Sequence, residues 1–146
     1  MIKRVASALL SLAMVPAIGC ELTVEDAYVR APIPGVPNTA AFLRINNSCS
    51  EPVSLIAGQA SAAKSVELHT HIHEDGMMKM RQVDAIIVAA NDSVELKPGG
   101  YHLMMFEIDS ALKDAKSTPI LLTFSNGQQV EFVAPLQDLM SKHHHH

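Results

Sequence analysis

The chain has 146 residues, of which 48% are hydrophobic and 18% are charged, and its formal net charge is −4 at pH 7. This length is ample for one domain and leaves little for a second. Acidic residues outnumber Lys and Arg by 15 to 11, and the aromatic residues are no Trp, two Tyr and four Phe. A surface of this kind repels nucleic acid and offers no basic patch rich in aromatic residues, so nucleic-acid binding is excluded.

The first 19 residues have the pattern of an export signal. A basic start, Met1 to Arg4, precedes an apolar run from Val5 to Ile18 and small residues before Cys20, and the run is too short to anchor the chain by spanning a membrane. We therefore expect a signal peptide at 1–19, a single domain at 20–140 and a periplasmic product. Cleavage leaves 9 Lys and Arg against 15 Asp and Glu, a formal charge of −6, which favours a cationic ligand or a basic patch on a partner.

Cys20 has two possible fates after export. The sequence Ala17-Ile18-Gly19-Cys20 approximates a lipoprotein box, in which Cys20 would be acylated and hold the protein to a membrane, but the usual Leu three residues before the Cys is absent. Left unmodified, Cys20 is free to form a disulfide with Cys49 in an oxidising compartment. We expect a soluble periplasmic protein in preference to a lipoprotein, with membrane contact only if Cys20 is lipidated.

The rest of the chain predicts short strands separated by turns, with almost no helix. A proline-rich loop at 31–38 cannot continue a ladder, and hairpin turns are expected at 74–76 and 125–127. Nine or ten short strands at regular spacing suggest an all-β fold, a β-sandwich. The expected strands are Leu22–Arg30, Thr39–Asn46, Val53–Gly58, Lys64–His73, Met77–Val83, Ala85–Ala89, Ser93–Leu96, His102–Ile108, Ile120–Phe124 and Gln128–Val133.

Two histidines and two methionines, His69, Met80, His102 and Met104, form a donor set suited to Cu(I). A thioether is a soft, neutral donor that coordinates poorly to Mg²⁺ or Ca²⁺, whereas imidazole accepts borderline and soft metals alike. A blue-copper site would need a Cys thiolate, and Cys49 lies in a turn with no His and Met shortly downstream. Cys49 is therefore not expected to bind copper.

Strand alternation indicates how these donors converge. Successive side chains on a strand point to opposite faces, so His102 and Met104 share one face. A hairpin turn at 74–76 returns Met80 toward His69. His71 and His73 have the same parity as His69 and are candidate secondary ligands. The other methionines singled out are interpreted as packing or membrane-insertion residues rather than ligands, namely Met14, Met78 and Met105.

The spacing of the four donors resembles that of the PCuAC-type periplasmic copper chaperones. Ten residues separate His69 from Met80, twenty-one separate Met80 from His102, and one separates His102 from Met104, which is the family signature at every interval. The phrases 66–69, 75–81 and 95–102 are also similar to the family. The resemblance spans about Leu22 to Pro135.

This resemblance implies a cupredoxin-like Greek-key β-sandwich with copper at one exposed end. It also implies delivery of Cu(I) to the CuA centre in subunit II of cytochrome c oxidase, alone or with a Sco-type thiol protein. We expect the protein to be a monomer. We expect no enzymatic activity, because the chain has no His-Glu-x-x-His motif, no nucleophile elbow and no convincing triad. Copper sequestration or tolerance is the alternative function, since storage would use the same four ligands.

The chain ends in a His-rich tail at 141–146. Its four consecutive histidines are either an expression tag or a native extension, and we favour the native extension. Clustered imidazoles favour Cu(II), so the tail is a candidate secondary metal site beside the Cu(I) site. The residues concerned are His143, His144, His145 and His146.

Overall fold

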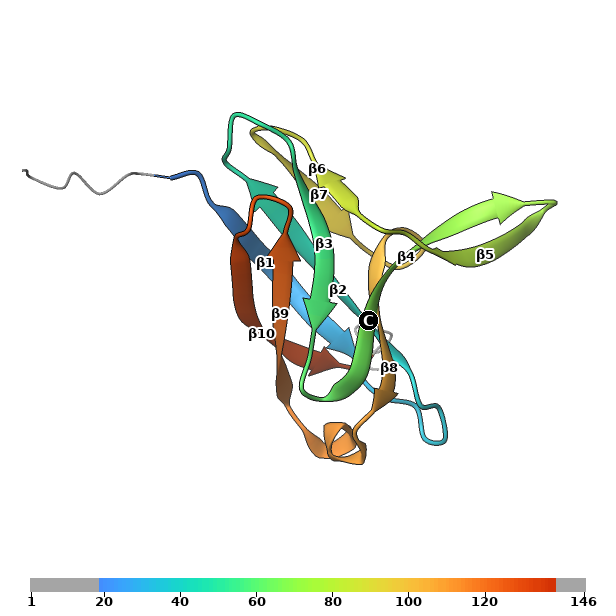
Figure 1. Cartoon of the computed structure of the whole chain (residues 1–146). Helices are drawn as coiled ribbons and strands as arrows, with labels where there is room; N and C mark the ends of the chain where they lie inside the picture. Colours follow the sequence, from blue (N-terminus) through green and yellow to red (C-terminus); the bar gives the residue numbers. More distant parts are fainter. Residues whose placement is uncertain (1–18, 139–146) are drawn as a thin grey trace, which may run out of the picture.

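The computed structural model describes residues 19–138, which form ten strands and one short 3-10 helix (Figure 1). The elements are β1 (Leu22–Arg30), β2 (Thr39–Asn47), β3 (Val53–Gln59), β4 (Ala63–Glu74), β5 (Met77–Gln82), β6 (Ile86–Val88), β7 (Asp92–Leu96), β8 (His102–Ile108), η1 (Ser110–Asp114), β9 (Ser117–Phe124) and β10 (Gln129–Gln137).

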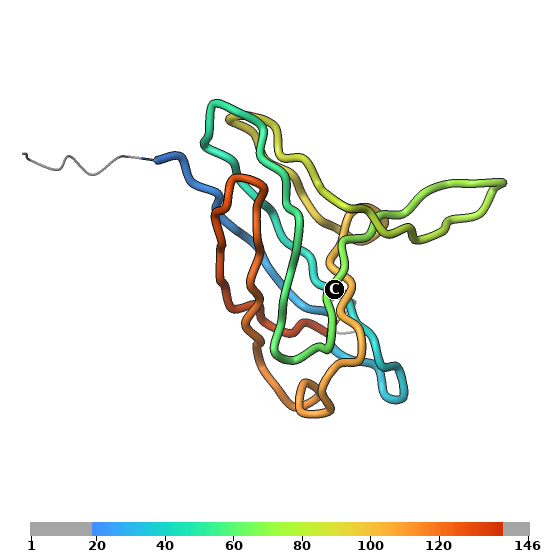
Figure 2. The backbone as a smooth tube through the Cα atoms, in the orientation of Figure 1, coloured from blue at the N-terminus to red at the C-terminus, as the bar shows by residue number. Residues whose placement is uncertain are grey.

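The strands form one sheet that closes on itself. Its order is β5-β4-β8-β2-β1-β10-β9-β3-β6, and an additional pairing between β4 and β3 joins the two ends of the central run. The result is a flattened barrel from which β5, β6 and β7 extend as extra strands beside β4, β3 and β2 (Figure 2). Closure occurs where Gly58 lies opposite Val66, and a Cβ at Gly58 would lie 3.0 Å from a Val66 methyl carbon. Closing the sheet pairs the edges of the barrel strands, and within residues 19–138 β5, β6 and β7 keep one free edge each.

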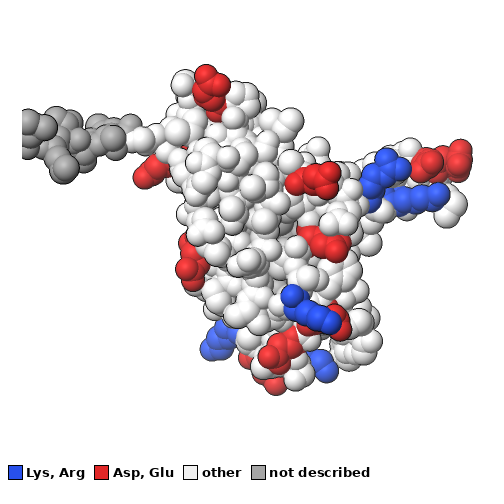
Figure 3. Space-filling model, viewed as in Figure 1, with Lys and Arg blue, Asp and Glu red and all other residues white. Residues whose placement is uncertain are grey.

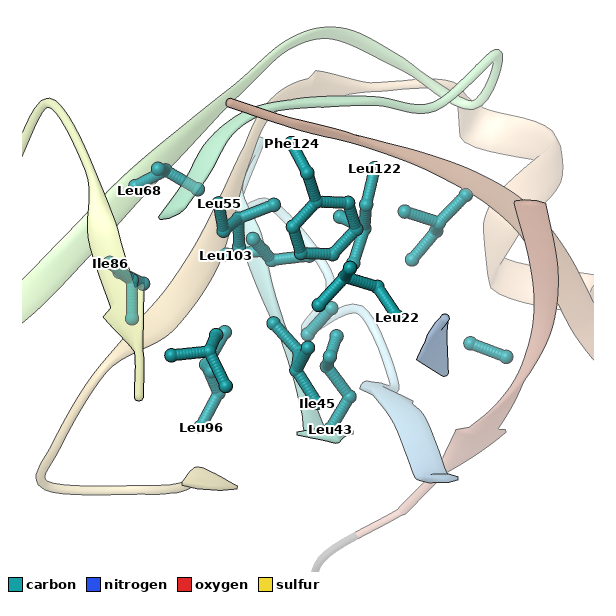
Figure 4. Packing of buried hydrophobic residues seen from close by; sticks show 14 of the residues in the cluster. Leu22, Leu43, Ile45, Leu55, Leu68, Ile86, Leu96, Leu103, Leu122 and Phe124 are labelled. Carbon is teal, nitrogen blue, oxygen red and sulfur yellow. The ribbon is translucent and has the colours of Figure 1, made fainter. Parts of the chain in front are cut away.

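The interior is filled by alternate side chains of these strands. Leu43 and Ile45 of β2, Leu103 of β8, and Leu122 and Phe124 of β9 meet in one cluster and are 0 to 2% exposed (Figure 4). Each fully buried aliphatic side chain contributes about 1.5–3 kcal/mol to folding. The prediction of an all-β fold is confirmed, and the predicted strands are found close to their expected positions.

Two strands are longer than the sequence suggested. β9 begins at Ser117 and β10 continues to Gln137, so each contains a proline, Pro119 or Pro135. At 117–119 β9 pairs with β10 but not with β3, whose pairing with β9 starts at Leu121. Proline is tolerated where a strand has a ladder on one side only, since its missing N–H can face away from the partner.

A bulge in β1 changes which residues face outward. The register of β1 against β2 shifts between Glu25 and Tyr28, and Asp26 adopts φ of 53°. An extra residue reverses the alternation of inward and outward side chains. Val29 consequently reaches the core with 0% exposure, while Arg30 lies on the outside over the Phe42 ring, 5.5 Å from its centroid.

Cys20, just before β1, and Cys49, between β2 and β3, are joined by a disulfide that closes a loop of sequence separation 29. Across residues 19–138, none of the helical structure is long and apolar enough to span a membrane. The predicted signal peptide, apart from Gly19, and the predicted His-rich tail lie outside the described residues.

Candidate metal centre

The two predicted histidines are direct cross-strand partners. β4 and β8 pair antiparallel with His69 opposite His102, and their ring centroids are 5.8 Å apart. The neighbouring pair, Leu68 and Leu103, points to the other face and is buried in the core. Partners in an antiparallel pair point to the same face, so the barrel core orients both imidazoles toward the outer surface of the sheet.

The two methionines lie on this same face. Met104 of β8 is opposite Glu67 of β4. Glu67 lies two residues before His69, so both it and Met104 are on the same face as the histidine pair. Met80 of β5 pairs with His71 on β4, in a hairpin that projects from the barrel (Figure 1). The exposed fraction of Met80 is 52%, whereas Met104 is half-buried. The structure thus places the four predicted residues on one face of three adjacent strands, with the histidines at the centre.

Each of the two histidines has one ring nitrogen fixed by a hydrogen bond and one that is free. His102 Nδ1 lies 3.1 Å from the carbonyl oxygen of Gly100, and His69 Nε2 lies 2.7 Å from a carboxylate oxygen of Glu67. These oxygens can only accept, so the bonded nitrogens donate and the others carry lone pairs in the neutral rings. His102 Nε2 and His69 Nδ1 are buried and have no hydrogen-bond partner among residues 19–138. Oriented imidazoles with an unused inner nitrogen are what metal-binding histidines require.

The environment of His102 also favours its neutral, metal-binding form. His102 is only 2% exposed. Burial is the main cause that lowers the pKa of His102 below 6.5, and the hydrogen bond to the Gly100 carbonyl opposes this shift. Electrostatic repulsion from His71, His69 and Arg30 lowers the pKa of His102 further. A ring that resists protonation keeps its lone pair available to a metal ion.

The histidine and carboxylate groups do not form a preassembled site by themselves. Among the described residues 19–138, no group of three or more His, Cys, Asp or Glu side chains could hold a metal ion as the side chains stand. The two free imidazole nitrogens nevertheless fit a soft or borderline metal, and the thioethers on the same face supply further neutral donors of the soft type.

Comparison with known proteins assigns the chain to a family. The model described as "Putative lipoprotein LpqE-like" matches residues 22–136. The chain belongs to the LpqE-like family. The predicted resemblance to PCuAC-type proteins is confirmed by this match together with the structural similarities.

One relative and two solved structures illustrate the similarity of this LpqE-like chain. A Leifsonia xyli subsp. xyli protein named "Putative lipoprotein Lxx21020" is 28% identical over 116 residues, which cover 79% of this chain and 69% of that protein. The copper-bound PCuAC domain from PmoF2 has a TM-score of 0.66 and 22% identity, covering 80% of this chain and 92% of that one. CuI-DR1885 from Deinococcus radiodurans has a TM-score of 0.63 and 26% identity, covering 78% and 76%.

The secondary candidates of the LpqE-like chain differ in their distance from the histidine pair. The ring of His71 is 5.1 Å from that of His102, closer than His69, and His71 Nδ1 is 3.4 Å from the same Gly100 oxygen. His73 is exposed, opposite Met78 and nearer the hairpin tip. Of the secondary candidates within residues 19–138, only His71 therefore adjoins the centre.

The methionines interpreted as packing residues do not all pack. Met105 is 0% exposed in the core, as expected, but Met78 is 53% exposed on β5, so packing in the core was wrong for Met78, whereas the expectation that it is not a ligand stays a prediction. Met78 has the parity of Met80 and lies in the β4–β5 hairpin, which extends beyond the barrel (Figure 1). Met14 lies outside the described residues.

Sequence reasoning missed several neighbours of the centre. Glu67 precedes His69 by two residues on the same face, so strand alternation could have identified it. Gly100 acts through its backbone carbonyl, for which the sequence carries no signal. Phe42, whose ring is 6.3 Å from that of His102, and Arg30 come from β2 and β1, and only the fold brings them to β8. Arg30 also helps to line a pocket of about 260 Å³ beside Met104.

Proposed function

We propose that this protein is a periplasmic copper chaperone that binds Cu(I) through His69, Met80, His102 and Met104. The observation that carries the proposal is the cross-strand histidine pair, with its two buried and unpartnered nitrogens. Neutral thioethers on the same face suit Cu(I) better than harder cations. The 26% identical CuI-DR1885 supports copper as the cargo of this chain.

The location of the donors suits transfer to a partner. Met80 is half-exposed on a hairpin outside the barrel, where an incoming ligand can replace it before the buried His102 is reached. Lys79 and Arg81 pair with residues of opposite parity to His71, so their charges are on the face of the hairpin away from the donors. Figure 3 shows the charged groups of this projecting hairpin beside a largely uncharged barrel face.

We propose the CuA centre of cytochrome c oxidase as the destination, reached directly or with a Sco-type thiol protein. The chemistry is ligand exchange and not catalysis, because neutral His and Met ligands bind Cu(I) less tenaciously than paired thiolates and cannot be lost to disulfide formation. Loss of oxidase activity with unchanged copper tolerance on deletion would support delivery. Copper sensitivity with intact oxidase would instead support sequestration.

Further parts of the proposal concern compartment and architecture. We propose export after cleavage of residues 1–19, a monomeric Greek-key arrangement of the cupredoxin type for 20–140, and capture of Cu(II) by His143 to His146. Relatives named as lipoproteins support export, and the disulfide supports an unmodified Cys20. Replacing the four tail histidines should lower the number of Cu(II) ions bound per chain and leave Cu(I) binding unchanged.

Anaerobic titration of Cu(I) against a competing chelator tests the ligand set. The parent should bind one Cu(I), and Met80→Leu, Met104→Leu and His102→Ala should each weaken binding by about tenfold or more, because a donor is lost while leucine approximates the shape of methionine. Met78→Leu is the matched control, since Met78 is equally exposed on the same strand and face. Equal affinities for Met80→Leu and Met78→Leu would show that Met80 is not a ligand.

A further inference from the structure

We infer that His71 is a fifth metal-binding side chain, which ligates Cu(II) at the position that Met80 takes when the site holds Cu(I). The inference rests on the proposed copper site and adds to it a choice of ligand by oxidation state. His71 and Met80 are direct cross-strand partners and project from the same face of the hairpin. Either side chain can therefore complete the coordination begun by His69 and His102.

The rings are close enough to share one ion. A ring centroid lies about 3 Å from a metal bound to its nitrogen, so two imidazoles on one ion have centroids no more than about 6.5 Å apart. The His71–His102 and His69–His102 centroid distances are 5.1 Å and 5.8 Å. The described residues hold no preassembled group of three such ligands, so binding requires the rings to turn about their side-chain torsions, which have several staggered minima.

One backbone carbonyl orients two of the three rings. The Gly100 oxygen lies 3.1 Å from Nδ1 of His102 and 3.4 Å from Nδ1 of His71. A shared acceptor favours the tautomer in which each ring keeps Nδ1–H and exposes the lone pair of Nε2. The ring of His71 is thus oriented by the same hydrogen-bond acceptor as the ring of His102. A surface histidine with no role in binding would not need such an acceptor.

Donor chemistry then separates the two oxidation states. Thioethers are soft and favour Cu(I), while imidazole nitrogen with oxygen donors suits the tetragonal geometry of Cu(II). Glu67, 2.7 Å from His69 Nε2, adds a negative charge that is worth more to a divalent than to a monovalent ion. His71 with His69 and His102 gives Cu(II) three nitrogens, and Met80 with Met104 gives Cu(I) two sulfurs.

The test compares His71→Ala with His73→Ala, its matched control two residues along the same face. Both are made in the full mature chain with His143 to His146 replaced by serine, so that the tail binds no Cu(II). Each protein is titrated with Cu(II) and, separately and anaerobically, with Cu(I), and the Cu(II) form is examined by electron paramagnetic resonance. His71→Ala should weaken Cu(II) binding by about tenfold or more and remove one nitrogen from the hyperfine pattern, with Cu(I) affinity changed less than about threefold.

Met80→Leu should give the opposite result, a loss of Cu(I) affinity with an unchanged Cu(II) spectrum. The inference is overturned if His71→Ala leaves the Cu(II) affinity and nitrogen pattern of the parent, or if it weakens Cu(I) and Cu(II) equally. Failure of the parent to bind Cu(I) would instead refute the proposed function, so the two failures are distinguishable. His73→Ala should match the parent in every measurement.

Discussion

At the scale of single residues, the donor atoms depend on the groups that hold them. His69 and His102 each use one nitrogen to bond a protein oxygen, Glu67 in one case and the Gly100 carbonyl in the other. Such outer partners fix the tautomer and the ring orientation of a metal ligand. Alternation along β4 was sufficient to predict that His69 and His71 share one face, but the role of Gly100 depends on a backbone atom and could not be predicted.

Glu67→Gln should weaken Cu(I) binding by about tenfold, because the amide keeps the shape of the side chain but loses the charge that holds the His69 ring. Chelator competition measures the affinity. Glu131→Gln on β10, which is exposed, controls for the change in net charge. Parent-like affinity for Glu67→Gln would mean that His69 is positioned by the strand alone.

The lowered pKa of His102 predicts a loss of stability in acid. The unfolded chain takes up a proton near the ordinary value of 6.5, whereas the folded chain does so only at lower pH. The unfolded state therefore binds more protons in this interval, and the free energy of unfolding falls as pH decreases below about 6.5, levelling off below the folded pKa. Urea unfolding of the apoprotein at several pH values should show a smaller acid loss for His102→Gln than for the parent.

The exposed His73→Gln variant is the control for that experiment, and it should keep the acid loss of the parent. Glutamine at position 102 retains an N–H donor for the Gly100 carbonyl, so the comparison isolates the titrating ring rather than the hydrogen bond. Parallel curves for His102→Gln and the parent would contradict the prediction.

At the scale of elements, the β4–β5 hairpin determines where Met80 points. Asp75 and Gly76 both have positive φ, 52° and 72°, and connect the strands by a two-residue turn. This is the backbone that type I′ hairpin turns require, and Asp-Gly is a preferred sequence for it. The turn fixes the register that puts Met80 opposite His71, so this part of the site was predictable from local sequence.

Exchanging two adjacent residues of β5 tests this parity. Lys79→Met combined with Met80→Lys keeps the composition but moves the thioether to the opposite face, since neighbours on a strand point in opposite directions. Cu(I) affinity should fall at least as far as for Met80→Leu, by about tenfold or more. Lys79→Met alone is the control and should bind Cu(I) as the parent does. Retained affinity in the double variant would exclude a role for strand parity.

At the scale of the whole molecule, two long-range connections stabilise the fold: the pairing of β3 with β4 that closes the barrel, and the disulfide between Cys20 and Cys49. Cys20 and Cys49 close a loop of sequence separation 29, which the chain-entropy model values at about 3–4 kcal/mol. Leu22, two residues after Cys20, is buried in the core. The disulfide and acylation of Cys20 exclude each other, because both use the same sulfur.

Cys49→Ala should therefore lower the free energy of unfolding by about 3 kcal/mol if the mature protein has the disulfide. Denaturant unfolding measures the change, and reduction of the parent should reproduce most of it. The intact mass of the mature protein provides an independent check, because reduction of a disulfide adds two hydrogens. A lipid adduct on Cys20, with little effect of Cys49→Ala, would favour the lipoprotein.

The sequence by itself determined the donor types, their spacing, the strand parity that puts them on one face, and the turn between β4 and β5. These features depend on covalent geometry and on neighbours within a few residues. Tertiary structure alone decided that β4 pairs with β8 so that His69 meets His102, that the β1 bulge brings Arg30 outward, and that burial withholds water from His102. Strand pairing across such distances is fixed by which register buries the apolar faces, a property of the whole core rather than of any segment.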